Sequence, residues 1–186
     1  MITIPSGVFL ERPELISIGP GTIIEPGVFI QGPCIIGAQC IIRHGAYLRG
    51  PLIIGDRCVV GHSAELKNSI LLDSCNATHF VYVGDSIIGN RVNLAAGVKC
   101  ANVRLDRKKI AVQFEEQQIQ TGLLKFGSIV GDRTQIGCNA VLNPGTLIGR
   151  ESLCYPLMNV RGYLPPETHA KGPSRSELIN EGILRL

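Results

Sequence analysis

Two cations on this chain have matching surroundings at a fixed distance. Arg49 and Lys67 are 18 residues apart, and each directly follows a leucine, Leu48 or Leu66. Such spacing predicts that the two side chains lie one above the other on adjacent turns of a regular structure. Cations held about 5 Å apart repel one another unless an anion lies between them, and phosphate is the obvious anion. The pair therefore indicates either a phosphate-binding site or two ordinary surface bases, and spacing alone leaves both interpretations open.

Three histidines form a second series. His44 and His62 have the same spacing as the two cations, and His79 follows His62 one position sooner than that spacing requires. A column of histidines suggests a metal ion, but the predicted stacking holds the outer two too far apart, so we expect no metal. We expect His44 and His62 to be structural hydrogen-bonding residues. His79 lies in the irregular segment THFVYVGDS, and because function concentrates in irregular backbone on a rigid scaffold, it is the candidate for chemistry.

The element that positions these residues is a repeat of six. A branched aliphatic residue recurs at every sixth position, at Ile18, Ile24, Ile30, Ile36, Ile42, Leu48, Ile54, Val60 and Leu66. A period of six fits neither a helix nor a simple alternating strand and is typical of a parallel β-helix built from hexapeptide repeats. Three hexads make one triangular coil, and successive coils stack at about 4.8 Å. Residues separated by three hexads are therefore predicted to be vertical neighbours.

The repeat also predicts the organisation of the chain. We expect an all-β fold, with a β-helix over 18–165, an N-terminal cap or first partial coil over 1–17 and a C-terminal tail over 166–186. The shortened steps from Leu66 to Leu71 and from Val83 to Ile88 are expected to tighten a corner. The repeat fails over 98–126, which holds the densest charge. Within that excursion, IAVQF and QQIQT are predicted to pair as a hairpin.

Composition excludes several classes of protein. The net charge of the 186-residue chain is only +3 and its basic residues are scattered, so we expect no nucleic-acid partner. No apolar run approaches the ~20 residues of a membrane span, and no signal-peptide pattern follows Met1. The seven cysteines lack paired CxxC spacing, which argues against disulfides or a zinc cluster. We expect Cys34, Cys40 and Cys58 to fill small inward positions in a cytoplasmic protein.

Residues 61–97, GHSAELKNSILLDSCNATHFVYVGDSIIGNRVNLAAG, carry a resemblance to a known family. They resemble the acetyltransferase domain of the bacterial bifunctional enzymes that make UDP-N-acetylglucosamine. The segment that follows is similar to the C-terminal domains of archaeal-type bifunctional sugar-1-phosphate nucleotidyltransferase/acetyltransferases. The resemblance covers most of 18–165, and its THFxYVGDS and VNLAAG blocks are far more specific than the hexads. It implies a left-handed β-helix acyltransferase that uses acetyl-CoA, needs no metal and assembles as a homotrimer with active sites between the prisms.

The resemblance also implies roles for individual residues. Three match catalytic positions: His79 as the general base, Glu65 as the partner of the imidazole or the substrate ammonium, and Asn102 as a residue that orients the amine. Histidine suits the first role because an imidazole titrates near neutral pH. The substrate-binding positions, mostly for the sugar phosphate, match Arg49, Lys67, Tyr82, Asn93 and Lys108. The acetyl-CoA positions, along a groove toward the C-terminal coils, match Ala96, Cys138 and Pro156.

The function so implied is N-acetylation of an amino-sugar 1-phosphate, with glucosamine-1-phosphate first, in nucleotide-sugar biosynthesis. The family usually joins this domain to an N-terminal nucleotidyltransferase. Because the hexads begin by residue 18, we expect the chain not to make nucleotide sugars by itself. Three alternatives remain: a non-catalytic sugar-phosphate-binding or scaffold subunit, an acyltransferase with another acceptor or donor, and zinc bound between subunits as in γ-type carbonic anhydrases. The histidine spacing does not match the last class.

Overall fold

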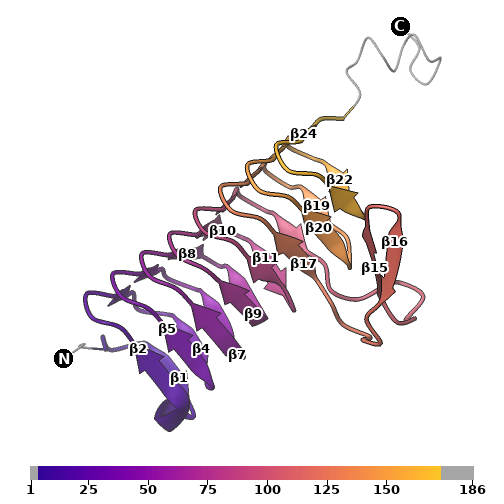
Figure 1. Cartoon of the computed structure of the whole chain (residues 1–186). Coiled ribbons are helices and arrows are strands. Elements are labelled where there is room, and N and C mark those ends of the chain that lie inside the picture. The colour runs from indigo at the N-terminus through magenta and orange to yellow at the C-terminus, as the bar shows by residue number, and fades with distance from the viewer. Residues whose placement is uncertain (1–3, 173–186) are drawn as a thin grey trace, which may run out of the picture.

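The computed structural model describes residues 4–172, and the chain winds through them as a left-handed parallel β-helix with the shape of a triangular prism (Figure 1). This confirms the predicted fold class. Each coil contributes one short strand to each of three faces, and vertical neighbours pair in parallel. Within residues 4–172, no helix is long and apolar enough to cross a membrane.

The three faces are named here in the order in which a coil visits them. The first face comprises β1 (Phe9–Glu11), β4 (Phe29–Gln31), the first parts of β7 (Tyr47–Ile54) and β9 (Glu65–Leu71), β11 (Tyr82–Gly84), β14 (Lys99–Cys100), β19 (Val141–Leu142) and β22 (Asn159–Val160). The second face comprises β2 (Ile16–Ile18), β5 (Cys34–Ile36), the second parts of β7 and β9, β12 (Ile87–Ile88), β17 (Ser128–Val130), β20 (Thr146–Ile148) and β23 (Tyr163–Leu164). The third face comprises β3 (Ile23–Ile24), β6 (Ile41–Ile42), β8 (Val59–His62), β10 (Asn76–His79), β13 (Asn93–Leu94), β18 (Gln135–Ile136), β21 (Leu153–Cys154) and β24 (His169–Ala170).

The hexad ladder forms the core, as predicted. Leu48 pairs with Leu66, three full hexads further along, whereas Leu66 pairs with Val83 one position early, because the step from Leu66 to Leu71 is shortened. Leu66, Leu71, Val83 and Ile88 are all fully buried, so both shortened steps keep the ladder facing inward. Burying an aliphatic side chain of this size contributes about 1.5–3 kcal/mol.

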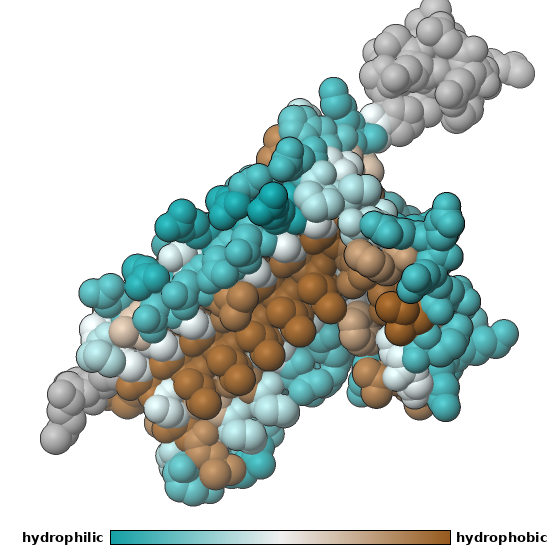
Figure 2. All heavy atoms as spheres, in the orientation of Figure 1, coloured by the Kyte–Doolittle hydropathy of each residue, from teal (hydrophilic) through white to brown (hydrophobic). Residues whose placement is uncertain are grey.

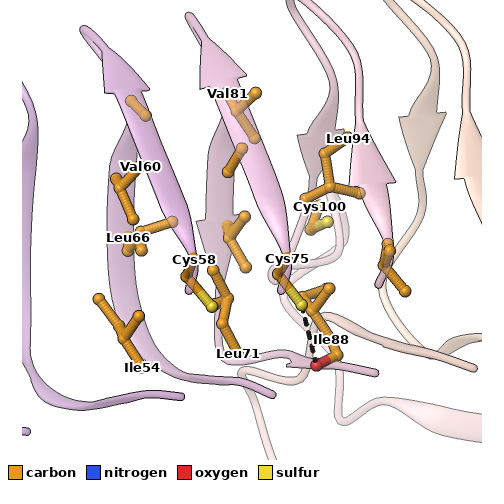
Figure 3. Close-up of a cluster of buried hydrophobic side chains, with 14 of the residues drawn as sticks. Ile54, Cys58, Val60, Leu66, Leu71, Cys75, Val81, Ile88, Leu94 and Cys100 are labelled. Atoms are coloured by element: carbon orange, nitrogen blue, oxygen red, sulfur yellow. Dashed lines mark hydrogen bonds between the residues drawn. The ribbon is translucent and has the colours of Figure 1, made fainter. Parts of the chain in front are cut away.

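Small thiols share the interior with these aliphatics (Figure 3). Cys58 and Cys75 lie on adjacent coils, and the Cys75 thiol donates to the Gly89 carbonyl at 2.8 Å. All seven cysteines are free thiols; Cys34, Cys40, Cys58, Cys75, Cys100 and Cys154 are buried, and Cys138 is exposed. The predicted inward positions of Cys34, Cys40 and Cys58 are therefore confirmed.

Carboxylates join successive coils at the corner between the second and third faces. Asp73 Oδ1 accepts from the Asp56 backbone N–H at 2.9 Å, and Asp132 Oδ1 accepts from the Asn90 N–H at 2.7 Å. A backbone donor that the turn would leave unpaired is thereby satisfied by the coil above. These side chains therefore bind neighbouring coils to one another along one edge of the prism.

Strand pairing extends past the predicted limits of 18–165 at both ends. β1 already pairs with β4, which fits the first partial coil that was one of the two expectations for residues 1–17. A short 3-10 helix, η1 (Pro13–Leu15), lengthens this first coil, so the partner of Phe9 is Phe29 and the hexad pattern is hidden. β24 pairs with β21 inside the predicted tail of 166–186, where the coil is shorter than a regular one. Residues 173–186 of that tail lie outside the described residues.

The excursion begins later than the predicted 98–126. Val98 and Cys100 are still buried in the prism, and Cys100 pairs with Leu142, beyond the far end of the excursion. The chain leaves the prism at Asn102 and returns at Phe126, whose N–H donates to the Asn102 carbonyl at 3.0 Å. The predicted hairpin is present as the antiparallel pair β15 (Ala111–Phe114) and β16 (Gln117–Gln120), which projects beside the prism (Figure 1).

Candidate functional site

Arg49 and Lys67 occupy paired positions on adjacent coils of the first face, as the spacing predicted. Each, however, is held by a carboxylate of the chain itself. Arg49 Nη1 donates to Glu65 Oε1 at 2.7 Å, and Lys67 Nζ donates to Asp85 Oδ2 at 3.1 Å. The repulsion for which an external anion was expected is therefore relieved internally. Both cations keep further N–H donors for a ligand, because guanidinium carries five and ammonium three.

Glu65 faces Arg49 in place of the imidazole, and its expected role toward the substrate ammonium stays a prediction. Its carboxylate pairs with Arg49, and within residues 4–172 it makes no hydrogen bond to His79. Both side chains of the pair are about one third exposed, at 38% and 34%, so solvent screens the attraction and the pair adds little stability. Glu65 thus orients the guanidinium on the first face.

Asp85 is a functional candidate that the sequence analysis missed. Its side chain is only 8% exposed and accepts hydrogen bonds from Lys67 Nζ, from Asn68 Nδ2 at 2.6 Å and from Asn102 Nδ2. Burial raises the pKa of the Asp85 carboxyl, but the three hydrogen bonds outweigh burial and hold that pKa below its ordinary value. The signal was present, because Asp85 stands three hexads after Lys67 and closes the VGD block.

Tyr82 and Asn102 converge over Gly84 on the same face. A Cβ at Gly84 would lie 2.6 Å from the Tyr82 hydroxyl oxygen and 2.7 Å from Asn102 Nδ2, so only glycine leaves room for both. Burial, followed by the nearby carboxylates Glu65 and Asp85, raises the pKa of Tyr82. The phenol therefore stays protonated and able to donate at neutral pH. Arg49, Lys67, Tyr82 and Asn102 form, with Glu65 and Asp85, one group that we call the first-face cluster.

His79 stands at the corner between the third and first faces, at the end of β10. The next three coils place Ala96, Cys138 and Pro156 in the same column. The Gly97 N–H donates to the His79 carbonyl, the Asn139 N–H to the Ala96 carbonyl and the Leu157 N–H to the Cys138 carbonyl, each at 2.9 Å. The structure therefore aligns the predicted base and the three predicted acetyl-CoA positions. We call this set the corner column.

The predicted column of three histidines holds for the backbone but not for the rings. His62 and His79 pair in register, and the His44 and His62 rings stack at 5.6 Å. Phe80, however, makes the next ring contact to His62, with centroids 5.3 Å apart and ring planes at 79°, in a T-shaped arrangement. Phe80 is in the left-handed region, with φ of 53°, and His79 is exposed. Within residues 4–172, no group of three or more side chains suited to a metal ion is present.

His44 and His62 have structural hydrogen bonds, as expected. His44 Nδ1 lies 2.8 Å from the Pro26 carbonyl oxygen, and His62 Nδ1 lies 3.0 Å from that of His44. Each imidazole thus joins its coil to the one before it. Among the described residues, the His79 ring has no such partner, so its nitrogens remain open to a substrate.

Lys99 fixes the turn that follows His79 and was also missed from the sequence. It pairs with Tyr82 on the first face, and its Nζ donates to the Phe80 and Gly97 carbonyls at 2.8 Å each. These contacts tie two successive turns of the corner together. Its position at the edge of the excursion, where the repeat fails, gave no signal for this role.

Two predicted residues belong to neither the first-face cluster nor the corner column. Asn93 is in β13 on the third face, between Asn76 and Gln135 in register. Lys108 is exposed on the excursion, where its backbone N–H donates to Asp106 Oδ1 at 3.3 Å. The structure therefore brings together most, but not all, of the residues that the resemblance implied.

Comparison with known proteins finds relatives that carry the name acetyltransferase. Residues 30–113 match the family described as the GMPPB C-terminal domain. The chain is 33% identical over 165 residues to the Uncharacterized acetyltransferase YaiX of Escherichia coli strain 536, covering 89% of this chain and 70% of that protein. It is 35% identical over 88 residues to the Bifunctional sugar-1-phosphate nucleotidylyltransferase/acetyltransferase of Sulfurisphaera tokodaii, covering 47% of this chain.

The coverage of these relatives differs. The chain spans only 22% of the Sulfurisphaera tokodaii protein and 20% of the Bifunctional protein GlmU of Methanococcus aeolicus, so it corresponds to a fraction of either. Among solved structures, it superposes on the Arabidopsis UDP-N-acetylglucosamine acyltransferase with a TM-score of 0.57 at 11% identity, over 82% of this chain and 57% of that one. At that identity, the superposition supports the fold alone.

Proposed function

The chain belongs to the hexapeptide-repeat acetyltransferase family, and from this premise we propose that it transfers the acetyl group of acetyl-CoA to the amine of an amino-sugar 1-phosphate. Glucosamine-1-phosphate is the favoured acceptor, and the product would enter nucleotide-sugar biosynthesis. The seven free thiols suit a reducing compartment, so we assign the reaction to the cytoplasm.

One observation carries the proposal: the first-face cluster and the corner column adjoin. Tyr82, in the cluster, follows closely on His79, and β10 ends at His79 where the chain turns onto the first face. The turn between His79 and Tyr82 would therefore lie between two ligand groups. A phosphate would bind at Arg49 and Lys67 on one side, and a thioester would lie along the corner column on the other. This arrangement suits an acyl transfer that joins a sugar phosphate to a coenzyme.

The chemistry that these residues support is general-base catalysis. An amino sugar arrives mostly as its ammonium, which must first lose one proton to solvent so that the nitrogen has a free lone pair. His79 would then accept a second proton from the nitrogen as that nitrogen attacks the thioester carbonyl carbon. The C–N bond forms, the C–S bond breaks, and the departing coenzyme thiolate takes up the proton from the imidazolium. A positioned general base is typically worth about 10²–10⁴-fold in rate.

The oxyanion of the tetrahedral intermediate needs a donor, and the corner column offers one. The backbone N–H groups of Ala95 and Gly97 donate to the carbonyls of Ile136 and His79. Among the described residues, the N–H of Ala96 between them has no backbone acceptor, so it is the donor that we assign to the oxyanion.

We propose that the second face is covered by neighbouring copies in a homotrimer. Its outward positions carry a ladder of aliphatics, with Ile35, Ile53, Ile87 and Ile129 exposed by 53%, 47%, 41% and 38%. Figure 2 shows an apolar band running along the prism between polar edges. Beside the excursion, the ladder lines a hollow of about 510 Å³. A contiguous apolar face of this kind is typical of an interface between proteins.

The homotrimer is tested with Ile53→Asp, which places a charge in the middle of the apolar band. We expect light scattering to show a trimer for the parent chain and a smaller species for the variant. Ile87→Asp should likewise give a smaller species than the parent chain. A parent chain that is monomeric at micromolar concentration would overturn the proposal.

The acetyl transfer is tested by thiol release from acetyl-CoA with glucosamine-1-phosphate. We expect turnover in the parent chain and a fall of at least about 10²-fold in His79→Ala, because that variant lacks the base. His44→Ala is the matched control, since His44 belongs to the same corner but bonds a carbonyl, and its turnover should change little.

The alternatives predict different results. Turnover only with another amino-sugar phosphate or another acyl donor would replace the acceptor or donor and keep the reaction class. Binding of sugar phosphate without thioester cleavage, in a folded oligomer, would overturn acetyl transfer in favour of a non-catalytic subunit.

A further inference from the structure

Asp85 joins the phosphate end of the first-face cluster to the base of the excursion. Its carboxylate accepts from Lys67 Nζ at 3.1 and 3.3 Å and from Asn102, the residue at which the chain leaves the prism. Its backbone carbonyl accepts from the N–H of Gly127, where the chain returns, at 2.8 Å. One residue thus contacts Lys67, a predicted phosphate-binding residue, and both ends of the excursion.

The local geometry holds this carboxylate in place. Asp85 has a φ of 48°, a left-handed conformation that aspartate and asparagine tolerate better than most residues. Its backbone N–H donates to the Lys67 carbonyl at 2.9 Å, so the lysine is bound at both its main chain and its ammonium. A lysine stem has four flexible carbons, and binding Nζ to a nearly buried carboxylate removes most of that freedom.

We propose that Asp85 is a positioning residue that fixes Lys67 and Asn102 in one arrangement, so that the phosphate contact and the contact that orients the amine are set together. The inference rests on the proposed function, in which these two residues contact the sugar phosphate. Asp85 itself need not touch the substrate. Its carboxylate acts through Lys67, and the excursion is held at the same point.

Asp85→Asn is the informative substitution. The amide keeps the size and the left-handed conformation, but it presents an N–H₂ group where Lys67, Asn68 and Asn102 all donate. We expect KM for the sugar phosphate to rise at least tenfold, with a smaller fall in kcat and no change in KM for acetyl-CoA. A purely structural role would lower the active fraction and the melting temperature and leave KM unchanged.

A double-mutant cycle tests whether Asp85 acts through Lys67. If it does, adding Asp85→Asn raises KM by a smaller factor in Lys67→Met than in the parent chain, because only the contact through Asn102 is left to lose. If the increase in KM of the double variant equals the product of the increases in the two single variants, the proposal is overturned. Glu151→Gln is the matched control, because Glu151 also pairs with a cation, Arg133, but on an exposed part of the later coils. Its KM should equal that of the parent chain.

Direct binding separates this proposal from the proposed function. Titration of glucosamine-1-phosphate into the parent chain and Asp85→Asn should show at least a tenfold weaker affinity in the variant, whether or not acetyl transfer occurs. Binding without turnover would sink the transfer reaction and leave the role of Asp85 intact. Equal affinity in the two proteins, or no binding to either, would overturn the role of Asp85.

A second variant covers a failure of Asp85→Asn to fold. Asn68 is exposed and left-handed, with φ of 46°, so Asn68→Gly removes one hydrogen bond to Asp85 without backbone strain. We expect KM to change in the same direction by a smaller factor. An unchanged KM in Asn68→Gly, in the absence of a folded Asp85→Asn, would count against the proposal.

Discussion

Cys138 gives the corner column a direct chemical probe. It is the exposed member of the seven cysteines, and the other six are buried. Burial raises the pKa of Cys34 and of Cys100 to about 12, and that of Cys154 to about 11. An ordinary thiol titrates near about 8.5, and the thiolate is the reacting species. The first two buried thiols should therefore carry roughly 10³-fold less thiolate than an ordinary cysteine, before poor access slows them further.

The expected labelling follows from these values and from access, because a hydrogen bond with the Cys58 side chain lowers the pKa of Cys75 and only burial protects that thiol. A thiol-alkylating reagent should modify one cysteine per native chain, at Cys138, and all seven after unfolding. Acetyl-CoA bound along the corner column would cover Cys138, which lies between Ala96 and Pro156 in that column. At a ligand concentration of about 100 times Kd, the free fraction falls to about one hundredth, and the labelling rate should fall by about the same factor.

Mass spectrometry of the peptide that contains Cys138 measures this rate with and without acetyl-CoA. Unfolded protein labelled in the presence of acetyl-CoA is the control for loss of reagent. An unchanged rate of Cys138 labelling at saturating acetyl-CoA, in a preparation that turns over, would refute its place in the coenzyme site. Labelling of the buried thiols as fast as Cys138 would refute the argument from burial.

Three further predictions concern stability and the site. Leu66→Ala removes a fully buried rung and should lower the free energy of unfolding by about 2–5 kcal/mol, measured from urea midpoints; a loss below about 1 kcal/mol would contradict the packing. Gly61→Ala places a Cβ against the Thr78 carbonyl, next to His79, so we expect a loss of about 1–3 kcal/mol in thermal melts together with reduced turnover, and unchanged turnover would speak against this coupling. Because the pKa of Asp85 is lowered in the folded chain, its stabilisation is present above about pH 4 and is lost as pH falls through the lowered value. Melting temperatures of Asp85→Asn should fall less steeply than those of the parent chain as the pH drops below about 4, and parallel curves would exclude this contribution.

The repeat predicted the vertical register because each hexad contributes one inward aliphatic residue, and each of these residues must stay buried over its counterpart in the coil before. That constraint placed Leu66 over Leu48 and carried through the short step to Leu71. It failed in the first coil, where η1 (Pro13–Leu15) adds residues outside the prism and so disturbs the count without disturbing the core.

Side-chain pairing in the site was harder to foresee, because it depends on diagonal neighbours. The short step shifts Asp85 by one position, so that Gly84 pairs with Lys67 and Asp85 reaches Lys67 Nζ from the next position. Glu65 reaches Arg49 across a diagonal in the same way. Phe80, in a left-handed conformation, supplies the ring that contacts His62. The sequence gives little indication of a left-handed conformation when the residue is not glycine.

The narrow base of the excursion separates the length of this segment from the register of the prism. The chain leaves the prism at Asn102 and returns at Phe126, and a backbone hydrogen bond joins these two residues. Cys100 then pairs with Leu142 in the register that an uninterrupted coil would have. Doubling the length of such a loop costs only about 0.6 kcal/mol in closure entropy. Insertions, deletions or wholesale exchange between these two residues would therefore leave the frame of every later coil unaltered. Under the proposed function, a change of the excursion could alter the sugar-phosphate end of the site while the coils that hold His79 keep their stacking.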